Sequence, residues 1–378
     1  MAERPGGPGP AGSLATRLER LAGAAVTALG PVGGDHGVRH YRAVLADGRE
    51  LFVKAVAHPA ATGGPGPAGR LSEASLALAA EASGLRWLSE AGAVPIPELI
   101  FSDYGLLALI WLPPGNADQR AAERFGRDLA SLHAAGSADF GAPWRGFIAG
   151  LPLPNEPPGL NDPSGLGERP GLNERPGLNE RPGLGEPSGL GEPSGLNEPP
   201  RSGLPGGPGA HADRAALAGS AHQTSPWPRW YAERRLLPYV RLARDAGTLG
   251  PADAALVETV AGRIAELAGP AEPPSRIHGD CWSGNLLWSG GRGWLIDPAA
   301  HGGHRETDLA MLELFGAPYL DRILAAYAEA APPADGWRQR VPLHQLHPLL
   351  VHVCLFGVGY RDAVLAAARA ALAGRRRP

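Results

Sequence analysis

The chain has 378 residues, 43% of them hydrophobic, which is enough for substantial cores and more than one domain. Its formal net charge of −3 gives no basic footprint for nucleic acid, so we expect no nucleic-acid partner. Two cysteines cannot build a disulfide framework. The first residues hold no apolar leader, and the longest strongly apolar run, 349–358, is shorter than the roughly 18 residues of a membrane span. These features favour a soluble, cytoplasmic protein with no membrane partner.

Glycine and proline, 54 and 40 residues, are concentrated in a few segments. Residues 1–12 are one such segment, and we expect them to be a disordered tail. Leucines at helical spacing then predict a first helix over residues 14–29. After it, Gly33 and Gly34 would lie at the tip of a hairpin that covers a bound nucleotide, although each glycine alone is equally typical of a plain turn.

Two apolar runs, 40–45 and 51–56, flank the pair Asp47 and Gly48. A two-residue turn signal between apolar runs predicts a β-hairpin. Lys54 lies inside the second run, so the predicted strand carries one cation on a sheet face.

A helix is predicted where four residues recur at three- and four-residue spacing, namely Leu78, Glu81, Leu85 and Leu88. This spacing places Glu81 on the apolar stripe of the helix. A lone carboxylate there costs free energy unless a positive group meets it. Lys54, on the neighbouring strand, is the expected partner of Glu81.

A strand predicted over 106–112 ends at the Pro-Pro-Gly sequence of residues 113–115, where we place a hinge. The chain is therefore expected to be α+β, with a small lobe of antiparallel strands and a helix over 13–115. A larger, mainly helical lobe follows over 116–378. Its helical patterns lie at 121–135, 230–245, 251–267, 306–315, 320–331 and 349–372.

Seven tandem six-residue repeats, each with a glycine, a leucine and at least one proline, fill residues 159–200. A β-helix is excluded because each repeat has a proline that removes ladder donors and offers only one leucine for a core. We expect a disordered, extended insertion at about 156–224 inside the second lobe. An Asn-Glu-Pro-Pro element stands at each end of the tract, one beginning at Asn155 and the other at Asn197.

The sequence His278-Gly-Asp-Cys-Trp-Ser-Gly-Asn285 is followed by the apolar run that ends at Asp297. A loop aspartate with an asparagine five residues later, and a second aspartate at a strand end, is the arrangement by which protein kinases hold a base and Mg²⁺. Asp280 would take the proton of an acceptor hydroxyl. Asn285 and Asp297 would supply oxygen ligands to Mg²⁺, and Lys54, held by Glu81, would bind the phosphates of ATP.

Neighbouring residues have other expected roles. Trp282, two residues after the predicted base, has no apolar pattern around it and would stack on a substrate. Asp308 would open the following helix and hydrogen-bond the catalytic loop, which His278 would brace. Cys281 is expected to be a small buried hydrophobe.

Three segments closely resemble the fructosamine kinase (ketosamine-3-kinase) family: residues 278–285, Ile296-Asp-Pro-Ala299 and Gly303-His-Arg-Glu-Thr-Asp-Leu-Ala310. The Trp-Ser-Gly of residues 282–284 distinguishes this family from aminoglycoside phosphotransferases and choline kinases, which are similar in fold. The resemblance implies a two-lobed, protein-kinase-like fold. It also implies ATP- and Mg²⁺-dependent phosphorylation of a sugar hydroxyl on a ketosamine, free or protein-bound, in a repair reaction that releases the amine.

The resemblance places the catalytic base on Asp280, the metal ligands on Asn285 and Asp297, and the ATP-binding pair on Lys54 and Glu81. Two alternatives stay open. The chain could be another small-molecule phosphotransferase of this fold, acting on an aminoglycoside or on choline. It could also be a catalytically silent kinase-like protein that binds partners through its repeats.

Overall fold

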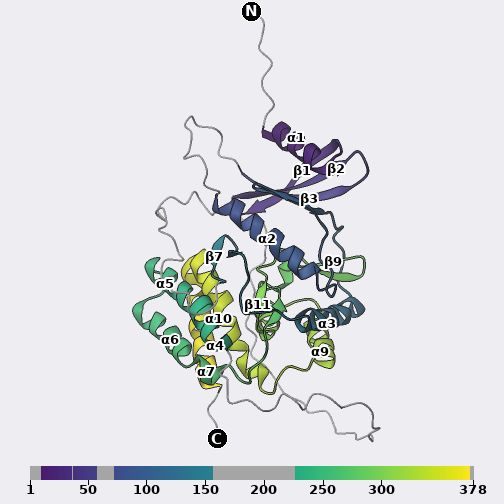
Figure 1. Ribbon diagram of the computed structural model, residues 1–378. Helices are drawn as coiled ribbons and strands as arrows, with labels where there is room; N and C mark the ends of the chain where they lie inside the picture. The colour runs from purple at the N-terminus through teal and green to yellow at the C-terminus, as the bar shows by residue number, and fades with distance from the viewer. Residues whose placement is uncertain (1–9, 36, 58–71, 156–225, 375–378) are drawn as a thin grey trace, which may run out of the picture. The chain divides into compact units, whose positions relative to one another are not determined.

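The structure is a computed structural model that describes residues 10–35, 37–57, 72–155 and 226–374 (Figure 1). The insertion expected at 156–224 lies outside these residues. The expected tail over 1–12 also lies outside them, except that the first helix already begins at Pro10.

A five-stranded antiparallel sheet forms the first lobe, in the order β1-β2-β3-β5-β4. Its predicted hairpin is present: β2 ends at Leu45, β3 begins at Glu50, and the Gly48 amide donates to the Leu45 carbonyl over 3.0 Å. Gly48 has φ +86°, a conformation in which glycine is favoured. The strands are β1 (Val26–Asp35), β2 (Val38–Leu45), β3 (Glu50–Val56), β4 (Leu99–Asp103) and β5 (Leu106–Ile110).

Helix α1 (Pro10–Ala22) ends seven residues before the end of the helix predicted over 14–29. The prediction was therefore wrong for residues 23–29. Gly23 follows the helix with φ +70°, and its amide still donates to the Glu19 carbonyl over 2.9 Å. A left-handed glycine is a common helix terminator. Beyond it the chain turns into β1, so the later part of the predicted helix is strand.

Helices cover both faces of the sheet (Figure 1). On one face Leu18 of α1 joins the cluster that contains the fully buried Leu51 and Val53 of β3. On the other face α2 (Glu73–Ser89) packs Leu78 and Leu85 in a cluster with leucines of β5. Alternation along β3 therefore leaves Lys54 on the α2 face, as its place in the strand predicts.

The predicted hinge leads from β5 into the second lobe. At its last residue, the Gly115 amide donates to the Trp288 carbonyl over 2.7 Å, which ties the connection to a hairpin of the second lobe. That lobe contains α3 (Gln119–Ala134), β6 (Gly146–Ile148), β7 (Leu151–Leu153), α4 (Pro226–Tyr231), a π-helical turn (Ala232–Leu236), α5 (Leu237–Asp245), α6 (Pro251–Gly262), α7 (Ile264–Leu267), β8 (Ser275–Ile277), β9 (Leu286–Ser289), β10 (Arg292–Leu295), β11 (His301–Gly303), α8 (Glu306–Phe315), α9 (Leu320–Ala330), α10 (Trp337–Phe356) and α11 (Arg361–Ala373).

The helix predicted over 349–372 is in fact two helices, which corrects that expectation. Helix α10 starts at Trp337 and continues through Pro342 and Pro348, two residues of a type that usually ends or kinks a helix. A 3₁₀ turn over Gly357–Tyr360 separates it from α11. The stretch Trp337–Ala373 is long and apolar enough by composition to cross a membrane. In the structure α10 packs into the main core, where Leu346, Leu350 and Val353 are fully buried.

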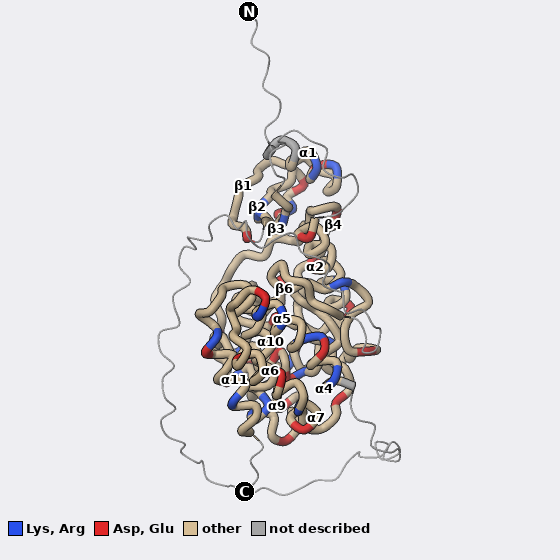
Figure 2. The backbone as a smooth tube through the Cα atoms, turned by 90° about the vertical axis from the view of Figure 1, so that its left-hand side faces the viewer, with Lys and Arg blue, Asp and Glu red and all other residues tan. Residues whose placement is uncertain are grey.

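The two asparagines that flank the repeats differ in the structure. Asn155 is buried, and its Oδ1 accepts from Arg235 Nη2 of the π-helical turn over 2.8 Å. The Arg235 guanidinium also lies 4.2 Å from the centre of the Trp230 ring. Asn155 thus fastens the chain before the insertion to the chain after it, while Asn197 lies outside the described residues. Figure 2 shows acidic and basic residues scattered along the tube of this lobe, among longer stretches of other residues.

Candidate active site

Lys54 and Glu81, predicted as partners, are in contact. Lys54 Nζ lies 2.9 Å from Glu81 Oε1 and 2.8 Å from Asp297 Oδ1. The three residues come from β3, from α2 and from the loop after β10. Lys54 is also the only lysine among the 35 basic residues of the chain. One buried cation therefore links both lobes at this point.

The charges of this group depend on one another. Burial by itself lowers the pKa of Lys54, but the carboxylates of Asp297 and Glu81 outweigh it and the net shift is upward. Burial raises the pKa of Glu81 to about 7, and the charge of Lys54 opposes that rise. With Lys54 held in its charged form between two carboxylates, we regard the pair as ionised at neutral pH.

Asp297 lies two residues after the end of β10 and has φ +54°, a left-handed conformation that few non-glycine residues adopt. The turn is held beside the catalytic loop because the Ile296 amide donates to the Asn285 carbonyl over 3.0 Å. The unusual backbone conformation thus turns the Asp297 carboxylate toward Lys54, where the expected metal site lies.

Asp280 and Asn285 are in direct contact. Asn285 Nδ2 donates to Asp280 Oδ2 over 2.8 Å and to the Asp280 carbonyl over 2.9 Å. Because the amide nitrogen is engaged with Asp280, the orientation of the Asn285 side chain leaves its Oδ1 for another partner. An amide oxygen is a ligand that Mg²⁺ accepts.

The Asp280 carboxylate lies in a poorly solvated position, and burial raises its pKa to about 7. The hydrogen bond from Asn285 opposes that rise, whereas the nearby negative charges of Asp297 and Asp308 add to it. A carboxylate with a pKa near the working pH is a suitable general base. This shift suits the role of proton acceptor that the sequence predicts for Asp280, and the role itself stays a prediction.

Asp308 holds the backbone of the catalytic loop, as the sequence predicts. The fully buried carboxylate accepts from the His278 amide over 2.8 Å and from the Gly279 amide over 2.9 Å. It also lies 3.2 Å from His133 Nε2 of α3. Burial by itself would raise the pKa of Asp308, but the hydrogen bond and charge of His133 outweigh it and the net shift is downward.

His278 braces the loop in the predicted way. Its Nε2 lies 2.9 Å from the Ile296 carbonyl, which can only accept, so Nε2 carries the proton. Its Nδ1 then accepts from the Asp280 amide over 3.3 Å. Burial lowers the pKa of His278, which keeps the ring neutral. The neighbouring Cys281 is completely buried, in agreement with a packing role.

Gly33 and Gly34 lie at the last positions of β1, close to the turn into β2. Gly34 has φ +154°, and a Cβ placed on it would lie 2.5 Å from the Val38 carbonyl oxygen. Only glycine fits this tight approach of the two strands. The expected contact of these glycines with a nucleotide stays a prediction.

Trp282 lies beside the catalytic loop with a half-buried side chain. Its ring contacts Phe315 of α8 edge-on, with 5.8 Å between the ring centres. It also covers Gly284, where an added Cβ would meet the ring. Stacking of Trp282 on a substrate is compatible with this position and stays a prediction.

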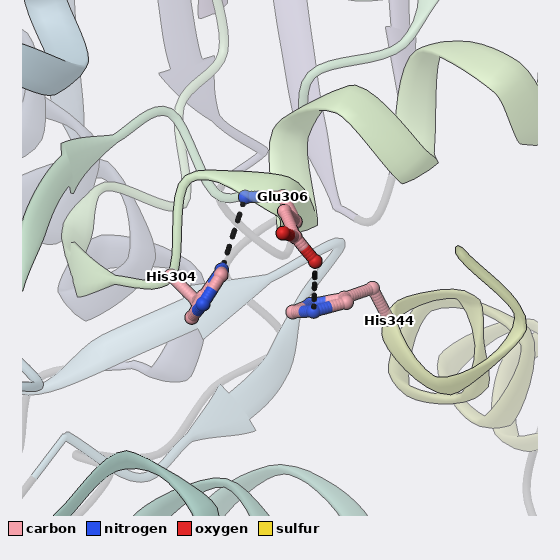
Figure 3. A group of neighbouring side chains, drawn as sticks. All are labelled: His304, Glu306 and His344. Carbon is pink, nitrogen blue, oxygen red and sulfur yellow. Dashed lines mark hydrogen bonds and ion pairs between the residues drawn. The ribbon is translucent and has the colours of Figure 1, made fainter. Parts of the chain in front are cut away.

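A polar cluster that no sequence signal indicated lies deeper in the second lobe (Figure 3). The ligand atoms of His304, Glu306 and His344 lie within 4.8 Å of one another, a grouping that could suit a metal ion. However, Arg340 occupies both oxygens of Glu306, with Nε 2.8 Å from Oε2 and Nη2 2.5 Å from Oε1. A carboxylate already neutralised by a buried guanidinium is better explained as a structural ion pair.

Taken together, the oxygen ligands of Asn285 and Asp297 and the cation Lys54 fit a magnesium nucleotide. Mg²⁺ prefers carboxylate and amide oxygens, and a lysine held by two carboxylates supplies positive charge for phosphates. Asp280 lies next to this group through its bond with Asn285. The arrangement can therefore bind a charged phosphate donor and remove a proton from an acceptor at one place.

Comparisons with known proteins agree on one family. The family model described as fructosamine kinase matches residues 215–373, less than half of the chain. A solved structure, described as a candidate fructosamine-3-kinase from Thermobifida fusca, is 42% identical, with 96% of this chain and 99% of that chain covered and a TM-score of 0.71. A probable ketoamine kinase of Synechocystis sp. is 27% identical over 290 residues, which are 75% of this chain and 74% of that protein.

The fold extends beyond these relatives. A thermostable mutant of an aminoglycoside phosphotransferase, solved in a ternary complex with ADP and hygromycin B, is 13% identical, with 97% of this chain and 100% of that chain covered and a TM-score of 0.51. This likeness shows the shared fold alone, and it confirms the predicted protein-kinase-like class with an antiparallel lobe and a helical lobe. Family membership follows from the 42% identity over nearly the whole Thermobifida fusca chain. The chain belongs to the fructosamine kinase family.

Proposed function

We propose that this protein is an ATP- and Mg²⁺-dependent kinase that phosphorylates a sugar hydroxyl of ketosamines, the adducts of an amine with glucose or ribose. The observation that carries the proposal is the contact of Asp280, whose pKa burial raises to about 7, with Asn285, beside the Lys54–Asp297 pair. Membership of the fructosamine kinase family supports the choice of acceptor.

In the proposed reaction, Mg²⁺ bound to the nucleotide neutralises negative charge on the phosphates. Asn285 Oδ1 and the Asp297 carboxylate would hold the metal ion. Lys54, kept in place by Glu81, would hold the phosphate oxygens. Asp280 would orient the acceptor hydroxyl and take its proton as that oxygen bonds to the γ-phosphorus of ATP. The bond from this phosphorus to the bridging oxygen of the β-phosphate would break at the same time, and ADP would leave. Asn285 would keep the Asp280 carboxylate in position.

We further propose a repair role in the cytoplasm, in which phosphorylation destabilises the adduct and the amine is released. The ketosamine would be a free sugar-amine or a glycated side chain of a protein. The family of the chain supports this role, and the two-cysteine composition is compatible with a reducing compartment.

The experiment is an ADP-production assay with a ribulosamine, a fructosamine, an aminoglycoside and choline as acceptors. We expect turnover of the ketosamines and not of the other two. Asp280→Asn is the matched control, because it keeps the shape of the side chain and removes the base. Turnover of the aminoglycoside or of choline in place of the ketosamines would refute the proposed acceptor.

Deleting residues 159–200 tests the alternative of a silent protein that works through its repeats. Asn155 and Arg235 fasten the chain on both sides of the insertion, so the shortened protein should keep its fold. We expect unchanged kinase activity. Loss of activity in a folded deletion variant would show that the repeats contribute to the site.

A further inference from the structure

A series of aromatic rings leads away from the catalytic loop across the second lobe. The rings belong to residues of the loop, α8, α10 and the turn before α11, and we call them the aromatic shelf: Trp282, Phe315, His352, Phe356 and Tyr360. Each ring contacts the next. The distances between centres are 5.8 Å from Trp282 to Phe315, 4.9 Å from Phe315 to His352, and 5.4 Å from His352 to Phe356.

The shelf is partly exposed to solvent. All five side chains keep some exposure to solvent, and Phe356 at its outer end is 48% exposed. Three of the rings contact one another, because the centre of the Tyr360 ring lies 4.8 Å from that of His352 and 5.9 Å from that of Phe356. A group of large aromatic side chains that are partly exposed together, with Phe356 at the surface, indicates a binding surface.

One end of the shelf is fixed to the reaction centre. Trp282 follows the base Asp280 by two residues, and the Trp282 amide donates to the Asp280 carbonyl over 3.1 Å. A ligand whose reacting hydroxyl lies at Asp280 would therefore extend its remaining part toward Trp282 and the other rings.

Among the described residues, no cation of the protein lies over a ring of the shelf. Five arginines in the described part of the chain lie over aromatic rings, and these rings are Trp111, Phe147, Trp230, Trp87 and Trp337. None of the five is a shelf residue. His352 adds no positive charge at neutral pH, because burial lowers its pKa. The faces of the shelf are thus available to a cation of the ligand.

We propose that the aromatic shelf binds the alkylammonium part of the ketosamine, while its sugar lies at Asp280. The identity of the ligand rests on the proposed function. A ketosamine carries a secondary amine that is protonated at neutral pH, next to a hydrocarbon chain when the amine is a lysine side chain. Aromatic faces attract such a cation through their quadrupole and cover the hydrocarbon chain at the same time.

Phe356→Leu tests the shelf without disturbing the core, because the Phe356 side chain is about half exposed and leucine keeps its apolar character. Tyr104→Leu is the matched control, since Tyr104 is an equally exposed aromatic residue, 51%, at the turn between β4 and β5. The substrates are ribulosyl-lysine and the same adduct acylated at its bridging nitrogen, which removes the positive charge. Binding of the parent amine without sugar or ATP is measured separately by calorimetry.

We expect Phe356→Leu to raise KM for ribulosyl-lysine about two- to five-fold and to weaken binding of the parent amine by a similar factor. KM for the acylated adduct and for ATP should not change, and Tyr104→Leu should change nothing. If Phe356→Leu changed KM equally for the charged and the acylated adduct, or changed neither, the proposed role of the shelf would be overturned.

The separate binding measurement distinguishes this inference from the proposed function. If no ketosamine is turned over but the parent amine binds in a manner that depends on Phe356, the shelf stands as an ammonium site and the proposed function fails. If ketosamines are turned over and the amine binds equally well to wild type and Phe356→Leu, the shelf is not an ammonium site, whereas the proposed function stands.

Discussion

The indole ring of Trp282 lies over Gly284, so closely that two ring atoms would be 2.3 Å from a Cβ added there. Gly284 does not have a positive φ, so its backbone conformation alone does not require glycine. The ring requires it. The tryptophan and the glycine between the proposed base Asp280 and the metal-ligand candidate Asn285 are thus one structural unit.

Gly284→Ala should displace the Trp282 ring without removing it. We expect KM for the ketosamine to rise about five-fold or more, since stacking contacts of one ring are worth about 1 kcal/mol. KM for ATP should change little. Steady-state kinetics with each substrate varied measures both. Gly262→Ala in α6, where an added Cβ meets nothing within 4 Å, is the control. An unchanged KM for the ketosamine would show that the position of the ring does not matter to the acceptor.

The raised pKa of Asp280 predicts an acid limb in the pH–rate profile. The base works deprotonated, so kcat/KM should fall about ten-fold per pH unit as the pH drops below about 7. Bound Mg²⁺ would neutralise Asp297, one of the charges that raise this pKa, and increasing Mg²⁺ should therefore move the limb to lower pH. Profiles at two Mg²⁺ concentrations measure the shift.

Asp280→Asn should reduce kcat by about two to four orders of magnitude and leave ATP binding largely intact, because it removes the base and no phosphate contact. The residual activity should lack the acid limb near pH 7. A variant that kept both the rate and the limb would exclude Asp280 as the base.

Several features of the site were predictable because their signals are local. The spacing of Asp280, Asn285 and Asp297 is contained in one short segment, and the Lys54–Glu81 contact follows from two amphipathic patterns. The structure brings all of these residues together. The ends of the elements were less predictable, since a glycine in a left-handed conformation ended α1 early and packing overrode two prolines in α10.

Contacts between distant residues could not be found from the sequence. The shelf joins position 282 with positions 315 and 352, and the pairing of Glu306 with Arg340 depends on how α8 and α10 pack. The sequence shows these residues only as members of apolar or polar helix patterns. Their contacts arise from packing that a single sequence without a structure does not specify.

Lys54, as the only lysine, permits a direct test of its environment. Its raised pKa and burial should make it react slowly with amine-directed reagents at neutral pH. Glu81→Gln removes one of its two carboxylate partners and should increase the rate of labelling and raise KM for ATP about ten-fold. Mass spectrometry counts at most one modified lysine side chain per molecule, and Mg²⁺-ATP should protect it.

The control for this experiment is Glu73→Gln, which alters an exposed carboxylate in the first turn of the same helix. It should leave both the labelling rate and KM for ATP as in wild type. Equal labelling of Lys54 in wild type and Glu81→Gln, with and without nucleotide, would contradict the assigned pairing.

Asp308→Asn should destabilise the protein and slow the reaction together. Each carboxylate oxygen of Asp308 accepts from a backbone amide of the catalytic loop. An asparagine offers one acceptor oxygen, so its NH₂ group would face one of these donors. We expect a loss of about 3 kcal/mol in the free energy of unfolding, and a lower kcat because the Asp280 loop is no longer held. Thermal or denaturant unfolding measures the first effect, and Asp321→Asn on the exposed face of α9 is the control.

The pH dependence of that loss gives a further check on its cause. The pKa of Asp308 is lower in the folded protein than its ordinary value, so its contribution is fully present above the unfolded-state pKa of about 4. The contribution disappears as the pH falls through the folded-state pKa. The difference in stability between wild type and Asp308→Asn should therefore be constant near neutral pH and shrink in acid. A difference that stayed constant into strong acid would indicate altered packing rather than loss of the charged hydrogen-bond acceptor.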